Sequence, residues 1–270
     1  MTHISFSELK NWQKCAYYHK LVHINKLKAF KGNEYTAFGN AIHSVCEQRC
    51  SGADDSFKDE EHFDEVFKSI LKDLEPEVEL NISLVRSMRS QARNIIPHIM
   101  ASLKDNFGDY EIISVEERLM EEIEDYISEE YSFKGFIDLV LKTKDGKYHI
   151  IDWKTCSWGW NAQRRSDPMT IYQLTFYKHY YAYKHKIDPE NIETHFALLK
   201  RTAKDDNIEM FRVSNGKKRT ENALKLLKEA LYNITNEKHV KNRLACHGPF
   251  GPCEFYKTQP QRQMSNNSVA

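Results

Sequence analysis

The segment 135-GFIDLVLKTKDGKYHIIDWKT-155 carries the pattern of two β-strands joined by a tight turn. Apolar residues fill both halves, and the Asp-Gly pair between them is a typical hairpin signal. Two acids, Asp138 and Asp152, interrupt these apolar runs. A carboxylate in a buried strand is costly unless a cation or a set of hydrogen bonds compensates it. We therefore expect both acids to be metal ligands or partners in an ion pair.

Lys154 follows the second acid, Asp152, two residues later in the same expected strand. Side chains alternate between the two faces of a strand, so Asp152 and Lys154 project from the same face. A carboxylate and an ammonium are thereby fixed close together. A buried salt bridge between Lys154 and the acids, without catalysis, is the plainer interpretation.

The hydrophobic pattern outside this hairpin predicts helices, three strands, a helix, two strands and a last helix. A change from helical to strand-like spacing falls near Tyr110, and Pro97 should interrupt a long helix. This order favours an α/β fold, in which helices flank a mixed central sheet. We expect three regions: an N-terminal helical region (1–108), a core (109–240) and a cysteine-containing segment with a polar tail (241–270).

Composition and net charge limit the classes of protein to which this sequence can belong. The 270 residues are 40% hydrophobic, enough for a core, and the formal net charge is zero, so binding to nucleic acid would need local basic patches. We find no apolar run of membrane-spanning length and no signal-peptide pattern, and we expect a cytoplasmic protein, or one in the host cytoplasm if it is viral. The six cysteines are then expected to be thiols or metal ligands rather than disulfides.

Two acids on adjacent strands, with a lysine on one of them, suit metal-assisted hydrolysis of a phosphodiester. Carboxylate oxygens favour Mg²⁺ or Mn²⁺. The metal would activate a water, and Lys154 would orient that water or stabilise charge on the phosphate. Either Glu116 or Glu117 can supply a third carboxylate, and we expect Glu116 to face the site.

The motifs together resemble the PD-(D/E)xK nuclease superfamily, and in particular its RecB-like branch, which includes CRISPR adaptation nucleases and phage exonucleases. The shared elements occur in the family's order over most of the chain. They are Gly39 to His43 in "GNAIH", Glu116 in "SVEE", Gly135 to Asp138 in "GFID", Asp152 to Lys154 in "DWK", and Gln173 to Tyr177 in "QLTFY".

The resemblance implies a restriction-endonuclease-like core and a role for each matched position. His43 would add an imidazole to the metal, Asp138 and Asp152 would be its carboxylate ligands, and Lys154 would be the catalytic lysine. Gln173 and Tyr177, one helical turn apart, would position the phosphate or support the lysine. A backbone carbonyl beside Ile150, Ile151 or Trp153 would complete the metal site, and Glu47 is a candidate to orient His43.

The activity implied is that of a metal-dependent DNA nuclease, an exonuclease on single strands or frayed ends, acting in recombination, repair, or phage or CRISPR DNA processing. Because the sequence has no Walker loop, opened DNA or a helicase or recombination partner would be needed. Two alternatives stay open: a structure-selective or nicking endonuclease on the same core, and a subunit that binds nucleic acid without cleaving it.

The loop 156-CSWGWNAQRRSDP-168 directly follows the lysine strand. Trp158 and Trp160 are candidates to stack on unpaired bases, and Arg164 and Arg165 to hold phosphates. The alternative is that the tryptophans cover the core and the arginines are surface charge.

Cysteines near both ends match a further feature of the resemblance. Many RecB-like relatives hold an iron–sulfur cluster with one N-terminal and three C-terminal cysteines. Cys15, Cys246 and Cys253 match three of these positions, and the fourth, near Gln259, has no cysteine. The three thiols could hold a cluster with another ligand, or Zn²⁺ together with His247, or the site could be degenerate.

Overall fold

The computed structural model describes residues 2–28, 31–54, 57–123, 131–248 and 251–256. The chain forms two compact units, each assembled from separate stretches of sequence. The larger unit comprises Gly32–Glu121 and Gly135–Thr220. The smaller unit comprises Met1–Lys31, Glu122–Lys134 and Glu221–Ala270. The three contiguous regions expected from the sequence do not coincide with these units.

A mixed sheet forms the centre of the larger unit. β4 pairs antiparallel with β3, where Leu139 lies opposite Ile151, and parallel with β5, where Asp152 lies opposite Phe196. β5 pairs antiparallel with β6, and β2 pairs with β3. The strands are β2 (Tyr110–Glu122), β3 (Tyr131–Thr143), β4 (Tyr148–Cys156), β5 (Ile192–Lys200) and β6 (Ile208–Val213).

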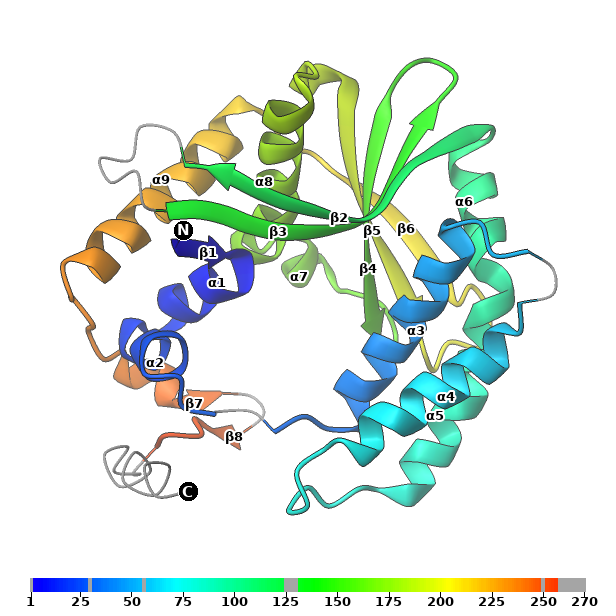
Figure 1. Cartoon of the computed structure of the whole chain (residues 1–270), viewed down its shortest axis with the longest axis horizontal. Helices are drawn as coiled ribbons and strands as arrows, with labels where there is room; N and C mark the ends of the chain where they lie inside the picture. The colour runs from blue at the N-terminus through cyan, green and yellow to red at the C-terminus, as the bar shows by residue number, and fades with distance from the viewer. Residues whose placement is uncertain (1, 29–30, 55–56, 124–130, 249–250, 257–270) are drawn as a thin grey trace. The chain divides into compact units, whose positions relative to one another are not determined.

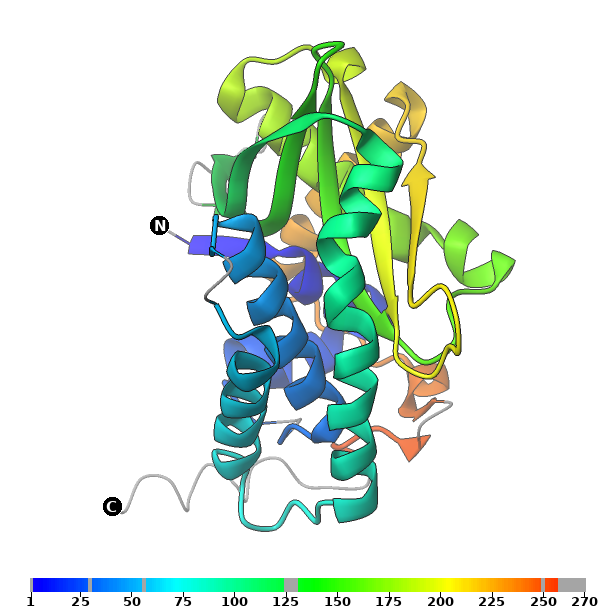
Figure 2. The same ribbon diagram turned by 90° about the vertical axis from the view of Figure 1, so that its right-hand side faces the viewer.

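Four helices pack together against one face of this sheet (Figures 1 and 2). They are α3 (Glu34–Cys50), α4 (Asp59–Lys72), α5 (Ile82–Ile95) and α6 (Ile99–Phe107). Alternate residues of β4, Ile151 and Trp153, are buried against them together with Phe38 of α3. The helix α3 starts at a capping box in which Asn33 and Thr36 bond each other's backbone N–H groups.

The long helical segment before β2 is broken at its proline, as the sequence predicts. Residues Ile96–His98 form a single 3₁₀ turn between α5 and α6, with Pro97 in its first turn. Proline lacks the N–H that an α-helix needs at this point, so the α-helix is interrupted there and the chain continues as a second helix. Figure 2 shows the two helices following one another along the sheet.

The other face of the sheet is covered by α8 (Pro168–His185), which follows the short α7 (Ala162–Ser166) (Figure 1). The carboxylate of Asp167 caps α8 by accepting a hydrogen bond from the Thr170 N–H, and proline at the first position suits that start. The helix ends where Lys186 adopts a left-handed conformation. A 3₁₀ turn, η3 (Pro189–Asn191), then leads into β5.

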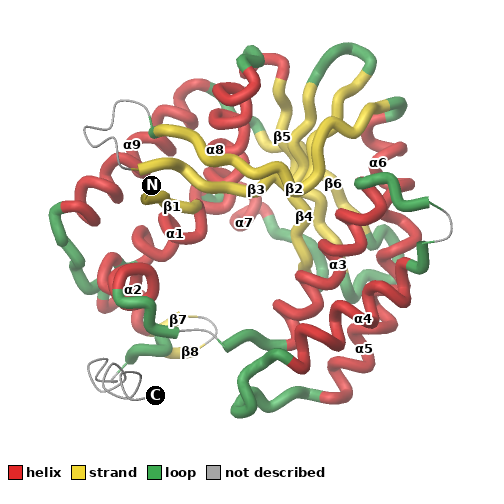
Figure 3. The backbone as a smooth tube through the Cα atoms, viewed as in Figure 1, coloured by secondary structure: helices red, strands yellow, loops and turns green. Residues whose placement is uncertain are grey.

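The smaller unit is mostly helical. Its strand β1 (Thr2–Ser5) pairs in parallel with the first four residues of β3, and β7 and β8 form a short antiparallel pair (Figure 3). The buried imidazole of His19 contacts the Glu8 carboxylate at 2.8 Å. The remaining elements are α1 (Phe6–Lys14), α2 (Ala16–His19), the π-helix η1 (Lys20–Ile24), α9 (Lys217–Thr235, which begins in the larger unit), η4 (Arg243–Cys246), β7 (His247–Gly248) and β8 (Gly251–Pro252).

The mixed sheet with helices on its faces confirms the expected α/β, restriction-endonuclease-like class. The sequence analysis missed β1, β7 and β8, which are only two to four residues long. The polar tail after residue 258 and most of the acidic stretch 121–130 lie outside the described residues. Among the helices that the structure describes, none is long and apolar enough to cross a membrane.

Candidate active site

Two carboxylates meet at the centre of the sheet in the larger unit. The pairing of Leu139 with Ile151 brings Asp138 of β3 next to Asp152 of β4. The Trp153 backbone N–H donates to Oδ2 of Asp138 at 2.7 Å. Asp152 is 1% exposed, so its side chain is fully in the protein interior. The hairpin therefore places the two acids together, as its sequence pattern indicates.

Lys154 and α8 surround the buried acid. The Lys154 ammonium lies 2.5 Å from Oδ2 of Asp152, and the Gln173 amide donates to Oδ1 at 2.9 Å. The same amide donates to the Tyr177 hydroxyl at 3.1 Å, so the two residues one turn apart form a chain that ends on Asp152. Gln173 thereby fixes the orientation of the carboxylate.

One oxygen of this carboxylate is compensated by the lysine. Oδ2 of Asp152 is buried, and the Lys154 ammonium contacts it at 2.5 Å. Burial raises the pKa of Asp152 to about 6, Lys154 opposes that rise and Asp138 adds to it. Burial likewise raises the pKa of Asp138. Two acids with these electrostatics attract a cation.

The histidine of the "GNAIH" motif comes to the same place from α3. Nδ1 of His43 lies 3.8 Å from Oδ2 of Asp138. Burial, followed by the charge of Lys154, lowers the pKa of His43 to about 4, so the imidazole is neutral and able to ligate a metal at pH 7. Gly39 lets the helix approach β4 closely, since a Cβ there would lie 3.4 Å from Oγ1 of Thr155.

The backbone of β2 has an unusual conformation at Glu116, and the side chains of Glu116 and Glu117 have different surroundings. Glu116 has a φ of 50°, which interrupts the alternation of β2. Partial burial and the charges of Asp138, Glu47 and Asp152 raise the pKa of Glu116 to about 7. Glu117 instead pairs with Lys184 at 2.8 Å and His185 at 2.5 Å on α8. The expected third carboxylate, Glu116, thus lies within electrostatic reach of the acid pair, and Glu47 lies within reach of Glu116.

These residues fit a hard divalent cation. They offer two carboxylates and one neutral imidazole, and one of the carboxylates is fully buried. Oxygen ligands are what Mg²⁺ and Mn²⁺ prefer, and Mn²⁺ also accepts imidazole. The residues involved are His43, Asp138 and Asp152, with Glu116 as a further acid, and we name this set with Lys154 the acid cluster.

The loop after β4 divides into a buried and an exposed part. Trp160 is buried against Phe196, with ring centroids 4.9 Å apart, and Arg165 pairs with Glu209 at 2.5 Å. Trp158 is 76% exposed, and the Arg164 guanidinium lies over the Trp160 ring. The structure thus engages Trp160 and Arg165 in packing, as the alternative interpretation expected, and leaves Trp158 and Arg164 accessible.

The three terminal cysteines line one pocket of the smaller unit. Sγ of Cys15 accepts a hydrogen bond from the Asn242 N–H, and the Cys253 N–H donates to the Cys246 carbonyl at 2.9 Å. His247 lines the same pocket. All six cysteines are free thiols. The described residues hold one set of three metal-ligand atoms that all lie within 4.8 Å of one another, and it contains no cysteine. A bound cluster or Zn²⁺ here stays a prediction.

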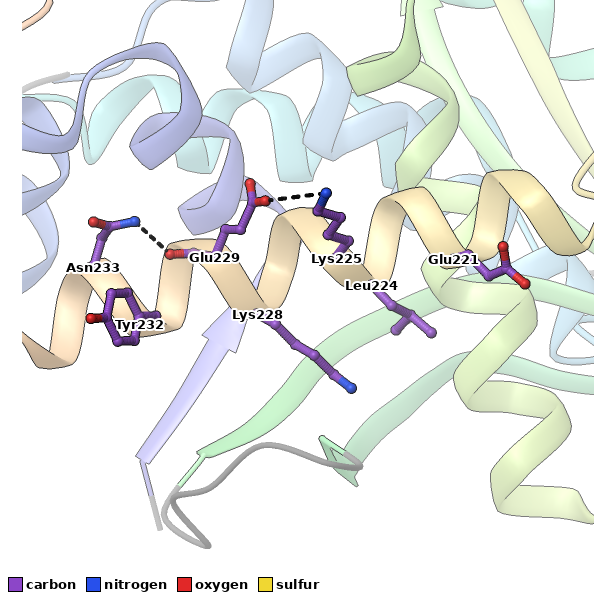
Figure 4. A pocket seen from close by; sticks show the side chains of 7 residues that line it. All are labelled: Glu221, Leu224, Lys225, Lys228, Glu229, Tyr232 and Asn233. Atoms are coloured by element: carbon purple, nitrogen blue, oxygen red, sulfur yellow. Dashed lines mark hydrogen bonds and ion pairs between the residues drawn. The ribbon is translucent and has the colours of Figure 1, made fainter.

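Sequence reasoning missed that one set, which consists of His149, Glu193 and His195 in the larger unit. No motif marks these residues, because they come from two strands whose pairing the sequence does not display. A separate shallow depression runs along the exposed side of α9, where Lys225 pairs with Glu229 (Figure 4). It contains none of the acid-cluster residues.

The chain is similar to known proteins in sequence family and in fold. The family model for the PD-(D/E)XK nuclease superfamily matches residues 3–255. None of the curated proteins matches the sequence. The solved structure of a candidate exonuclease from Eubacterium rectale is 14% identical, with a TM-score of 0.57 over 87% of this chain and 82% of its own. LHK-Exo, solved in complex with dAMP, is 12% identical, with a TM-score of 0.36 over 76% of this chain and 94% of its own. Because the family model spans nearly the whole sequence, the chain belongs to the PD-(D/E)XK nuclease superfamily.

Proposed function

We propose that this protein is a Mg²⁺- or Mn²⁺-dependent deoxyribonuclease that degrades single-stranded or frayed DNA from its ends. The observation that carries the proposal is the acid cluster, in which the buried Asp152 carboxylate lies between a lysine ammonium, a second aspartate and a neutral histidine. A structural ion pair has no need of a second acid and a neutral histidine at the same point. The preference for ends rests on the resemblance to RecB-like nucleases.

Each residue of the acid cluster has a distinct task in this proposal. His43, Asp138 and Asp152 would hold the divalent ion, which supplies a Lewis acid for the phosphate and lowers the pKa of a bound water. Lys154 keeps a positive charge next to the reacting phosphate. Gln173 holds the Asp152 carboxylate in place, and the Tyr177 hydroxyl in turn accepts from Gln173.

Glu116 is suited to a proton-transfer role. Its pKa of about 7 means that both protonation states are populated at neutral pH. A group in that condition can accept a proton from an attacking water and release it again. We assign it the part of a general base or a third carboxylate.

The exposed part of the loop after β4 supports contact with DNA. The indole of Trp158 is available to stack on an unpaired base, and the exposed Arg164 guanidinium is available to a phosphate. Because the sequence lacks a Walker loop, we propose that a helicase or recombination partner supplies opened DNA. Binding should weaken as salt concentration rises.

The deciding experiment follows end-labelled single-stranded DNA, linear duplex and closed circular DNA with Mg²⁺, Mn²⁺ or EDTA. Wild type is compared with Lys154→Ala and with Lys184→Ala, a matched control that removes an ammonium paired with Glu117. We expect metal-dependent loss of linear DNA, abolished in Lys154→Ala and retained in Lys184→Ala. The labelled end that disappears first gives the polarity.

Other outcomes would change the assignment. Cleavage of closed circles by wild type would make the protein an endonuclease. Binding of DNA without cleavage in either metal would mean that the acids serve structure or assembly, and the proposal would be wrong. Replacing DNA by RNA of the same sequence tests the choice of substrate.

For the cysteine pocket we propose a bound iron–sulfur cluster or Zn²⁺, held by Cys15, Cys246 and Cys253 with a fourth ligand such as His247. Its support is that all four side chains line one pocket. Anaerobic purification followed by iron, sulfide and zinc analysis, beside Cys246→Ser, tests it. Wild-type protein free of all three would refute it.

A further inference from the structure

A compact cluster of two histidines and a glutamate lies in the larger unit, outside the acid cluster. His149 is at the start of β4, and Glu193 and His195 are on the neighbouring β5. In the parallel register His149 lies opposite Glu193, so the three side chains project from the same face. His149 and His195 are each 7% exposed. The strands thus bring three donor groups into a largely dry environment.

The three donor atoms form a nearly regular triangle. Nδ1 of His149 lies 3.2 Å from Nε2 of His195, and Oε2 of Glu193 lies 3.9 Å from each of these nitrogens. A tetrahedral ion with bonds of about 2.0–2.1 Å needs its ligand atoms about 3.4 Å apart. A spacing of 3.9 Å is too long for a hydrogen bond but close to that requirement.

Neighbouring residues hold these donors in place. Lys147 and Arg212 both contact Oε1 of Glu193, at 3.2 and 3.3 Å, which leaves Oε2 facing the imidazoles. Oγ1 of Thr143 contacts Nε2 of His149 at 3.0 Å and fixes that ring, leaving Nδ1 directed at the centre of the triangle. Metal-ligating histidines commonly have their second nitrogen held in this way.

The protonation states suit a metal. Burial, then the proximity of His149, lowers the pKa of His195 to about 4, and burial also lowers the pKa of His149. Burial alone would raise the pKa of Glu193, but Lys147 and Arg212 outweigh it and the net pKa is lowered. Two neutral imidazoles and one carboxylate are the states that bind a transition ion.

This cluster is separate from the acid cluster. His149 and Asp152 are three residues apart on one strand, so their side chains leave opposite faces of the sheet. The ring of Phe107, at the end of α6, packs on both imidazoles, with centroids 4.8 and 5.1 Å away. The histidines therefore belong to the face covered by α3 to α6, whereas Asp152 faces α8.

We propose that His149, Glu193 and His195 form a second metal site, which takes a zinc-class divalent transition ion through two imidazole nitrogens and one carboxylate oxygen. Imidazole-rich sites select such ions over Mg²⁺, which prefers oxygen ligands. The ion ties β4 to β5 at the end of the sheet next to the β3–β4 turn. Its role is to strengthen the pairing of the two strands, one of which carries Asp152 and Lys154.

The test uses the full chain with Asp152→Asn and Cys246→Ser, changes that disable the two other candidate metal sites. Co²⁺ is titrated first, because its visible absorption reports four-coordinate binding, and Zn²⁺ is then added to displace it. We expect one Co²⁺ per chain, displacement by Zn²⁺, and a rise in Tm that levels off at one Zn²⁺ per chain. Absence of both the absorption and the rise in Tm would overturn the proposal.

Variants at the cluster complete the test. His149→Gln with His195→Gln should abolish Co²⁺ absorption and the Zn²⁺-dependent rise in Tm. Glu193→Gln preserves the size of the side chain and should weaken Zn²⁺ binding by at least about tenfold, so it serves if the double variant does not fold. His98→Gln, which changes an exposed histidine of the same unit, should leave binding unchanged. Undiminished binding in Glu193→Gln and in the double variant would refute the assignment.

Discussion

Strand β4 carries a polar cluster on each of its faces, and burial acts on the two in opposite directions. On the α8 face, burial raises the pKa of Asp152 to about 6, although the Lys154 ammonium opposes that rise. On the opposite face, burial lowers the pKa of His195 to about 4 and leaves a neutral ring. In the acid cluster, a buried carboxylate charge costs free energy. In the cluster of His149, Glu193 and His195, burial keeps the imidazoles uncharged. We therefore expect function to depend more on the first cluster, and stability more on the second.

The largest effect is expected for Asp152→Asn. Losing this carboxylate should reduce the nuclease rate about a thousandfold or more, equivalent to about 4 kcal/mol. Stability should not fall. Because the pKa is raised in the folded state, the stability contribution of Asp152 decreases as pH rises from about 4 to 6, and removing the charge at pH 7 relieves it. Rates with Mg²⁺ or Mn²⁺ measure the first effect, and Tm in EDTA measures the second. A large drop in Tm would show that Asp152 stabilises the fold, and would contradict the expected difference between the two clusters.

His43→Ala should have the next largest effect. Removing one neutral ligand while both acids remain should lower activity about 10- to 100-fold, and added Mn²⁺ should restore part of it. Rate against metal concentration measures the change. His98→Ala, at an exposed position, is the control. If metal concentration has no influence on the defect, His43 acts on the substrate rather than on the ion.

Glu117→Gln tests an acid that belongs to neither cluster. Burial alone would raise its pKa, but hydrogen bonds from Lys184, Ser114 and His185 lower it overall. Its stabilisation is therefore present above pH 4.5 and is lost as pH falls through the lowered pKa. The variant should lose about 1–3 kcal/mol at pH 7 and nothing in strong acid. Urea unfolding at several pH values measures this, and a pH-independent loss would contradict the ion pairing.

Gly39→Ala should have the smallest effect. The added methyl would press on Oγ1 of Thr155 and shift α3, which carries His43. Alanine also favours the helix by about 1 kcal/mol, so stability should change little while activity falls severalfold. Parallel Tm and rate measurements separate the two. Unchanged activity would show that the acid cluster tolerates movement of α3.

The site residues that could be predicted from the sequence are those marked by a short sequence pattern. Asp138, Asp152 and Lys154 stand out because charges interrupt an apolar hairpin, and Gln173 because it matches a family motif. The choice between Glu116 and Glu117 could not be derived by alternation, since the φ of 50° at Glu116 breaks that rule. Trp158 and Trp160 look alike in sequence and differ only in packing.

The second metal site could not be found from sequence for a different reason. His149 and His195 are 46 residues apart and meet only because β4 and β5 pair in parallel in one particular register. A shift of one residue would turn either side chain to the other face. Long-range pairing of this kind is decided by the whole sheet, not by a short segment.

The division of the chain into two units has a consequence for its synthesis. The larger unit is complete once the ribosome has passed Thr220, whereas the first residues need partners at the far end, such as Val240 for the Tyr17 N–H. At ordinary elongation rates the N-terminal segment waits about 10 to 40 s after its own synthesis for those partners. The strands can therefore form their sheet, with β1 paired to β3, while α2 still lacks its partner near Val240.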